Sequence, residues 1–261
     1  MEKTPLLAVS ATPVDIWYEG PHFVVADKPQ GLAVHPDTVD TTNALVNSLL
    51  QSNRWLAEME TSHAPGVIHR LMAGDRGLVV VAKSDDSVKE LRQLYNDHRF
   101  LFSYRVRLPK DINPQTIDSV RVLDHQIYDN VAIWDIDTPL GDTALLRQDW
   151  LLDPQADAYF VCYRVSIPFG DKVTHVALGE RMKLPAIDLY TVPPCSICNG
   201  TKALLSYNGF GYVDHTLDND ATIQTMRQLR GDERGIPVIV INNTVSVGFD
   251  RHRLKQALGL Y

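Results

Sequence analysis

The chain has 261 residues, 44% of them hydrophobic and 22% charged, so it is long enough for two globular domains. No apolar run approaches the roughly 20 residues of a membrane-spanning helix, and the first residues form no secretory signal, so we expect a cytoplasmic protein without a membrane partner. The net charge is −7, and the acidic excess lies before residue 185, because residues 185–261 hold equal numbers of basic and acidic side chains. An acidic N-terminal part is a poor electrostatic start for binding a polyanion.

Residues 13–109 predict alternating strands and helices. β-Branched and aromatic residues between Gly and Pro breakers mark the strands, and apolar residues at helical spacing mark the helices. The expected elements are two strands in "DIWYEGPHFVVADK" joined at Gly20 and Pro21, an ordered loop over 28–36, a helix from about Thr42, a strand over "GLVVVAKS", a helix capped by Ser84 and a strand over "FLFSYRVRLP".

Residues 110–183 are less regular. Two strand-like stretches, "YFVCYRVSIPF" and "VTHVAL", stand among polar and Pro-bearing connectors. The first holds Cys162, which we expect to be buried and unreactive. The composition changes at "RMKLPAIDLYTVPPC", so we place a boundary at Leu184 between two domains, 1–184 and 185–261.

Residues 185–261 predict the thioredoxin-like β-α-β-α-β-β-α order, an α/β fold. The expected elements are strand 187–191, a helix to about Tyr207, strand 210–216, helix 219–230, strands 237–241 and 244–248, and helix 250–258. Asn242 and Asn243 suit the tight turn between the last two strands, because Asn tolerates positive φ.

Cys195 and Cys198 form a C-x-x-C pair at the start of the first of these helices, directly after Pro194. Free backbone N–H groups and the helix dipole stabilise a thiolate there, so we expect Cys195 to be a nucleophile. Cys198, one turn along, is placed to resolve a mixed disulfide formed at Cys195. Two alternatives stay open. They are a zinc site, for which this pair supplies only two of four ligands, and two ordinary buried cysteines.

The stretches "IDLYTVPPCSICNGTKALLSYNGF" and "GIPVIVINNTVSVGFDRHRLKQALG" resemble a glutaredoxin-like protein across 185–261. The resemblance implies dithiol–disulfide exchange at Cys195 and Cys198 and a cis bond before Pro237, which in that family faces the cysteines. The Gly-Gly-Asp stretch that helps the family hold glutathione is "VGFD" at 247–250, without its first Gly. We therefore expect no tightly bound cofactor. The expected reductant is glutathione or a thioredoxin-reductase-type donor, and the expected partner is a disulfide-containing protein or small thiol.

The stretches "DIWYEGPHFVVADKPQGLAVHP", "TTNALVNSLL", "VIHRLMAGDRGLVVVAKSDDSVKELRQLY" and "YRVRL" resemble, in the same order, RNA pseudouridine synthases of the RluA/RsuA type. The resemblance covers about 13–108 and implies an α+β domain with a mixed sheet. The family motif runs H-R-L-D-x-x-T-S-G-L, and its Asp attacks the target nucleotide. His69 and Arg70 match it, but Met72 stands at the Asp position, and Asp75 and Arg76 stand at the Thr and Ser positions.

Met72 cannot act as a nucleophile or base, because a thioether is a weak acceptor without a titratable proton near neutral pH. Tyr104 matches the family's Tyr beneath the target base. In "GDKVTHVAL", Thr174 and His175 match the family's late G-R-T-H-Q-I-R motif, and Lys172 stands near the position of its first Arg, which in that family pairs with the catalytic Asp. The resemblance thus implies a degenerate cleft, that of a pseudoenzyme unless Asp75 has taken over the role. The cleft residues are His69, Arg70, Met72, Asp75, Tyr104 and Lys172.

Arginine and aromatic side chains of this domain could still hold a flipped-out base. The alternative is that they are solvated charges balanced by neighbouring acids. The arginines are Arg70 and Arg76 beside the expected cleft and Arg99, Arg105 and Arg107 around Tyr104. We expect no metal site, because His35 and His69 match motif positions with structural roles.

Three functional hypotheses result. The first is a glutaredoxin-like dithiol–disulfide oxidoreductase fused to an inactive synthase-like module that targets RNA or a protein partner. The second is an RNA pseudouridine synthase that acts on ribosomal or transfer RNA through Asp75, with the redox domain as regulator. The third is a non-catalytic adaptor, associated with RNA or the ribosome, whose thiols sense redox state.

Overall fold

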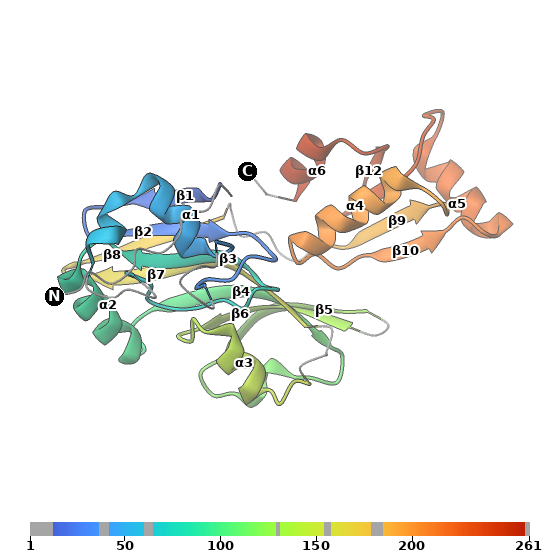
Figure 1. Cartoon of the computed structure of the whole chain (residues 1–261). Coiled ribbons are helices and arrows are strands. Elements are labelled where there is room, and N and C mark those ends of the chain that lie inside the picture. Colours follow the sequence, from blue (N-terminus) through green and yellow to red (C-terminus); the bar gives the residue numbers. More distant parts are fainter. Residues whose placement is uncertain are drawn as a thin grey trace.

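A computed structural model describes residues 13–36, 42–59, 65–128, 131–153, 158–178 and 185–258. Two sheets organise these residues, one of eight strands in the N-terminal domain and one of four strands in the C-terminal domain (Figure 1). The predicted boundary at Leu184 lies outside the described residues. Within the described ranges, no helix is both long and apolar enough to span a membrane.

The N-terminal sheet is mixed, as the resemblance implied, with the order β1-β2-β3-β7-β4-β6-β5 and β8 paired to β7. Only the pairing of β3 with β7 is parallel among the described strands of this sheet. The strands are β1 Asp15–Glu19, β2 Phe23–Lys28, β3 Arg76–Ala82, β4 Leu101–Pro109, β5 Arg121–Ile127, β6 Val131–Thr138, β7 Tyr159–Phe169 and β8 Lys172–Ala177. The helices are α1 Leu45–Ser52, η1 Arg54–Glu58, α2 Asp85–Asn96, η2 Pro114–Thr116 and α3 Thr143–Asp149.

Local signals in the sequence place most of these elements. Ser84 caps α2 as predicted, because its hydroxyl accepts a hydrogen bond from the backbone N–H of Ser87. The helix expected from Thr42 begins only at Leu45, because Ala44 is extended and bridges Ala33. Sequence reasoning does not predict β5, β6 or α3.

Strand alternation gives the N-terminal sheet two unlike faces. Phe102 and Tyr104 of β4 point to a face on which aromatic rings from α2 and from the chain after α3 are packed. Arg105 points to the opposite face, where its Nε donates to Oδ1 of Asp135 in β6 at 2.9 Å. Because Asp135 is charged, β6 resembles a polar stretch in the sequence although it is a core strand. Its carboxylate can be buried because Arg105 of β4 pairs with it.

Lys28, at the end of β2, fixes the loop between His69 and β3. Its side chain is fully buried, and its ammonium group donates to the carbonyl oxygens of Leu32 at 2.7 Å and Asp75 at 2.6 Å. The backbone N–H of Gly31 adds a bond to the carbonyl of Ala73 at 2.7 Å. The chain after β2 and the chain before β3 are therefore held together as one unit.

The C-terminal sheet has the order β10-β9-β11-β12. The elements are β9 Ile187–Thr191, α4 Ser196–Tyr207, β10 Val213–Thr216, α5 Asp220–Arg230, β11 Val238–Ile241, β12 Thr244–Val247 and α6 Arg251–Ala257. Helices α4 and α6 pack on one face through Leu205 and Leu254, and α5 packs on the other through Met226. Asn242 and Asn243 have φ values of 48° and 69°, so the predicted tight turn and the thioredoxin-like order are confirmed.

We predict that replacing Lys28 by Met changes how stability depends on pH. Burial lowers the pKa of Lys28 from 10.5 to about 8, so between these values the unfolded chain binds a proton that the native chain does not. The stability of the wild type relative to Lys28→Met should therefore rise with pH across this window, by up to about 1.4 kcal/mol per pH unit. Urea unfolding of both proteins at pH values from about 7.5 to 9.5 measures the gap. A gap that does not change with pH would contradict the prediction.

Candidate functional site

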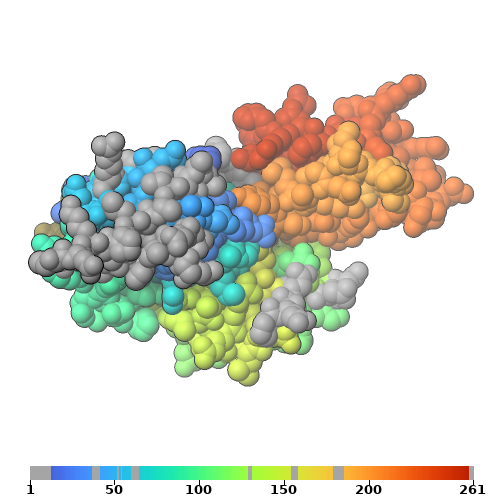
Figure 2. Space-filling model, in the orientation of Figure 1, coloured from blue at the N-terminus to red at the C-terminus, as the bar shows by residue number. Residues whose placement is uncertain are grey.

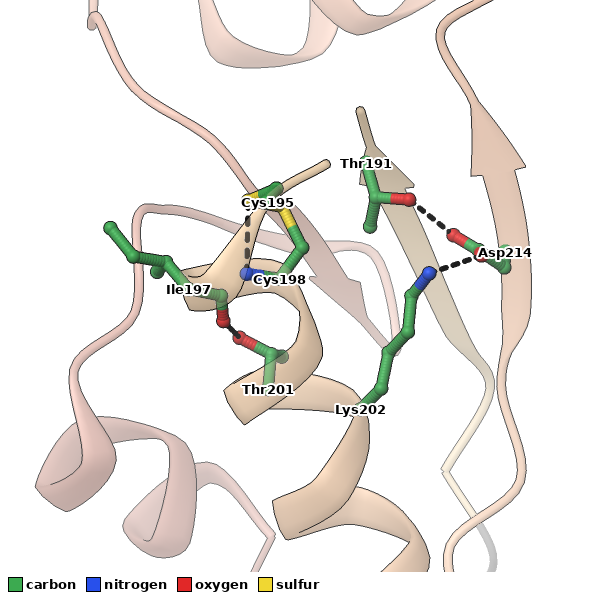
Figure 3. Close-up of a disulfide and its surroundings, with 7 residues drawn as sticks. All are labelled: Thr191, Cys195, Ile197, Cys198, Thr201, Lys202 and Asp214. Atoms are coloured by element: carbon green, nitrogen blue, oxygen red, sulfur yellow. Dashed lines mark hydrogen bonds and ion pairs between the residues drawn. A yellow bond between two sulfur atoms is a disulfide. The ribbon is translucent and has the colours of Figure 1, made fainter. Parts of the chain in front are cut away.

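Cys195 and Cys198 lie at the N-terminal end of α4, where they form a disulfide with Cα atoms 5.3 Å apart (Figure 3). Cys195 is the N-cap residue, and its sulfur accepts a hydrogen bond from the backbone N–H of Cys198 at 3.0 Å. Cys198 is 1% exposed, whereas Cys195 is partly exposed. An incoming thiol or disulfide therefore reaches Cys195 first, which fits a nucleophile followed by a resolving cysteine.

Two prolines border the cysteine pair. Pro194 is exposed directly before Cys195, and the bond that precedes it is cis, a feature that sequence reasoning missed. The bond before Pro237 is also cis, as the resemblance implied. Val238 pairs with Tyr190 near the end of β9, so Pro237 lies at that end of the strand. The chain leaves β9 at the same end and runs on to the cysteines.

A polar group joins α4 to the sheet behind the disulfide. Lys202 lies 2.5 Å from Oδ2 of Asp214, and the hydroxyl of Thr191 donates to Oδ1 of the same carboxylate at 2.7 Å (Figure 3). Thr191 is the last residue of β9 and is 2% exposed, so these contacts fix how the chain leaves the sheet towards Cys195. Sequence reasoning missed the group because each member alone is typical of a solvated surface.

Apolar side chains are exposed beside the cysteine pair, together with the polar Ser196. Ile197, between the two cysteines, is 52% exposed, and Pro194 is exposed beside it.

Asp250 matches the Asp of the family's glutathione stretch, and here it caps α6. Its carboxylate accepts hydrogen bonds from the backbone N–H groups of Arg253 and His252, at 3.0 and 2.9 Å, and these bonds hold the pKa of Asp250 below its usual range.

The first two residues of the synthase-like motif have different surroundings. The backbone N–H of Val80 donates to Nε2 of His69 at 3.2 Å, so Nδ1 carries the proton and donates to the carbonyl of Gly141 at 3.0 Å. Burial lowers the pKa of His69 to about 4, and the neutral ring joins two segments of the fold. Arg70 is 64% exposed, with Nε 3.5 Å from Asp142. Among the described residues, no group of three His, Cys, Asp or Glu side chains could hold a metal ion.

Met72 and Asp75 occupy opposite environments. The side chain of Met72 is 45% exposed, and its backbone N–H donates to the hydroxyl of Thr143 at 2.9 Å. Asp75 is fully buried, and its Oδ1 accepts hydrogen bonds from the guanidinium of Arg147 at 2.6 Å and the backbone N–H of Phe160 at 3.1 Å. Burial raises the pKa of Asp75, and Arg147 opposes that rise. The loop thus presents the thioether to solvent and keeps the carboxylate inside.

Lys172 does not belong to this cleft, contrary to the prediction. It pairs with Phe169 at the tip of the β7–β8 hairpin, whereas Asp75 bonds to Phe160 near the start of β7. The two ends of this strand lie roughly 30 Å apart. The cation beside Asp75 is Arg147 of α3, which sequence reasoning missed because no motif marks that helix.

Tyr104 is fully buried, with its ring 6.2 Å from that of Phe160 and 6.3 Å from that of Phe102. Burial raises the pKa of Tyr104 well above its usual value. The predicted arginine cluster around this ring is wrong at Arg105, which points to the opposite face and pairs with Asp135. Cys162 is buried as predicted, and burial raises the pKa of its thiol.

The sequence matches two known families. Residues 22–133 match RNA pseudouridylate synthase, and residues 187–245 match glutaredoxin. An uncharacterized RNA pseudouridine synthase of Aquifex aeolicus (strain VF5) is 33% identical over 94 residues, which cover 36% of this chain and 30% of that protein. Ribosomal large subunit pseudouridine synthase D of Zymomonas mobilis subsp. mobilis is 36% identical over 94 residues, with the same 36% and 30% coverage. The matched stretch thus spans under a third of these curated relatives.

Solved structures of both kinds are similar to this chain. Human RNA pseudouridylate synthase domain containing 4 is 13% identical, with a TM-score of 0.43, over 62% of this chain and 87% of that one. The thioredoxin-like protein BC3987 is 30% identical, with a TM-score of 0.25, over 27% of this chain and 97% of that one. From the two family matches and the two sheets, the chain joins an N-terminal RNA pseudouridylate synthase domain to a C-terminal glutaredoxin-like domain.

Proposed function

We propose that the protein is a dithiol–disulfide oxidoreductase acting through Cys195 and Cys198. The observation that carries the proposal is the placement of a partly exposed Cys195 at the N-terminus of α4, with Cys198 buried one turn behind it. Helix N-termini stabilise thiolates, and the exposed Ile197 gives the pair an apolar rim. A buried structural disulfide would need neither feature.

The reaction is a two-step exchange in which electrons pass from this protein to its substrate. The thiolate of reduced Cys195 attacks one sulfur of a substrate disulfide, which forms a mixed disulfide and releases the other substrate sulfur as a thiolate that takes up a proton. Cys198 then loses its proton and attacks the sulfur of Cys195. This step forms the Cys195–Cys198 disulfide and releases the second substrate thiol. Two electrons and two protons from glutathione or a thioredoxin-reductase-type donor restore the dithiol.

For the N-terminal domain we propose a binding role towards RNA or a protein partner. The Zymomonas relative is named a ribosomal large subunit pseudouridine synthase, which makes structured RNA the first ligand to test. The loop that holds the motif presents Arg70 and Met72 to solvent, and these side chains can contact a phosphate and a base without catalysing a reaction on either.

A second candidate is uridine isomerisation in ribosomal or transfer RNA through Asp75. One observation favours it, the 2.6 Å ion pair between Asp75 of the motif loop and Arg147 of α3, since the family's catalytic Asp also pairs with an arginine. The burial of Asp75 opposes it, because the carboxylate reaches a nucleotide only if the loop held by Lys28 opens. We therefore rank this activity below thiol exchange.

We predict that Cys195→Ser lowers the rate of reduction of a model protein disulfide by at least about a hundredfold, because the serine hydroxyl is not ionised at neutral pH. Cys198→Ser should instead accumulate a mixed disulfide at Cys195, since the resolving thiol is missing. Cys162→Ser is the matched control, because this buried thiol takes no part. Turnover with insulin and mass spectrometry of the trapped species measure the three variants. Unchanged turnover in Cys195→Ser would end the redox proposal.

We predict that the wild-type protein releases no tritium from ribosomal or transfer RNA labelled at uridine C5, because the exposed Met72 cannot attack and Asp75 is out of reach. Uridine isomerisation must expel that atom, so counting tritium in water tests the second candidate directly. If wild type releases tritium and Asp75→Asn does not, while Met72→Ala still does, the carboxylate acts from its new position. Circular dichroism of Asp75→Asn must first show that the variant is folded.

A further inference from the structure

The C-terminal end of α4 contacts the sheet face of the N-terminal domain that carries Arg105. The guanidinium of Arg76 donates to Oδ1 of Asn208 and lies 4.7 Å from the centre of the Tyr207 ring. The hydroxyl of Tyr159 donates to the carbonyl oxygen of Tyr207 at 2.6 Å. Two donors from the N-terminal domain thus meet the end of a helix that carries partial negative charge.

Beyond the end of α4, the contact continues through apolar groups. Arg105, already paired with Asp135, lies 4.5 Å from the centre of the Phe210 ring. A side chain at Gly211 would collide with the Tyr128 ring and with Ile133, because a Cβ atom there would lie 2.4 Å and 2.9 Å from them. Distances this short show that the two domains are packed here as closely as side chains are in a protein interior.

We infer that this contact is a permanent interface, so that the two domains form one rigid body. Two domains joined in one chain ordinarily move relative to each other. Here, however, charged and hydroxyl donors bind the end of α4, and apolar side chains pack tightly beside them. We name the contacting surface of the N-terminal domain the docking face, made of Arg76, Arg105, Tyr128, Ile133 and Tyr159.

The interface determines what each domain can present to partners. The cysteine pair lies at the other end of α4, roughly 18 Å from the docking face, so it points away from the N-terminal domain. Figure 2 shows the C-terminal domain in contact with the N-terminal domain at one end and projecting from it at the other. The docking face is occupied by the protein's own helix, so RNA bound to this chain uses another surface, such as the loop with Arg70 and Met72.

Gly211→Leu is a steric test of the interface in the full-length protein. The new side chain collides with Tyr128 across the interface, so the C-terminal domain should detach and tumble with a shorter rotational correlation time than the N-terminal domain. Adding Tyr128→Ala makes room for the leucine and should restore one shared correlation time. Gly200→Leu is the matched control, because a Cβ atom at Gly200 has no neighbour within 4 Å. Backbone ¹⁵N relaxation measures all four proteins.

The outcomes are distinct and do not depend on redox activity, so a failure of the proposed exchange reaction leaves this test intact. One correlation time in the wild type and the Gly200→Leu control, two in Gly211→Leu and one in the double variant support the interface. Two correlation times in the wild type, or no change in Gly211→Leu, overturn it. An RNA oligonucleotide should leave the amide shifts of Tyr128 and Gly211 unchanged, and displacement of the C-terminal domain by RNA would also overturn it.

Discussion

Arg76 is the constraint on which the arrangement of the chain depends. Its guanidinium donates to Asp27 of β2 at 2.9 Å and to Asn208 after α4, and the Tyr207 ring lies over it. A lone arginine between two domains would add little, since exposed ion pairs contribute about 0–1 kcal/mol. This one is 15% exposed and ties strand to helix, which makes its geometry specific. Arg76 follows directly after Asp75, so the motif loop ends at a residue that contacts the C-terminal end of α4.

The motif loop is well ordered although Met72 stands where the resemblance implies an Asp. Met72 occupies the position of the expected carboxylate and points to solvent, while Asp75 is buried against Arg147. A buried carboxylate is tolerated only with a partner, and the guanidinium supplies one. Lys28 then holds the backbone of the loop through the carbonyl of Asp75. These contacts account for a well-formed loop whether or not it still acts on RNA.

The order of elements in the C-terminal domain could be predicted because most of its signals are local. The Asn-Asn turn and a cysteine at a helix start each follow from a few neighbouring residues, whereas the cis bond before Pro237 was implied only by the family resemblance. The N-terminal domain could be predicted only as far as its motifs reach. The roles of Arg147 and Asp135 depend on partners far away in the sequence, Asp75 and Arg105. Lys172 was misplaced because a match of only two residues to the late motif does not fix the alignment.

The proposal that Cys195 and Cys198 exchange disulfides can be tested by measuring the reduction potential of this pair. The full-length protein is equilibrated in thiol–disulfide buffers, quenched with an alkylating reagent and scored by mass spectrometry for the dithiol and disulfide forms. We expect a midpoint between about −180 and −270 mV, the range that protein disulfide isomerase, the glutaredoxins and thioredoxin span. A midpoint below about −300 mV is that of a structural disulfide and would rule out disulfide exchange as the role of this pair.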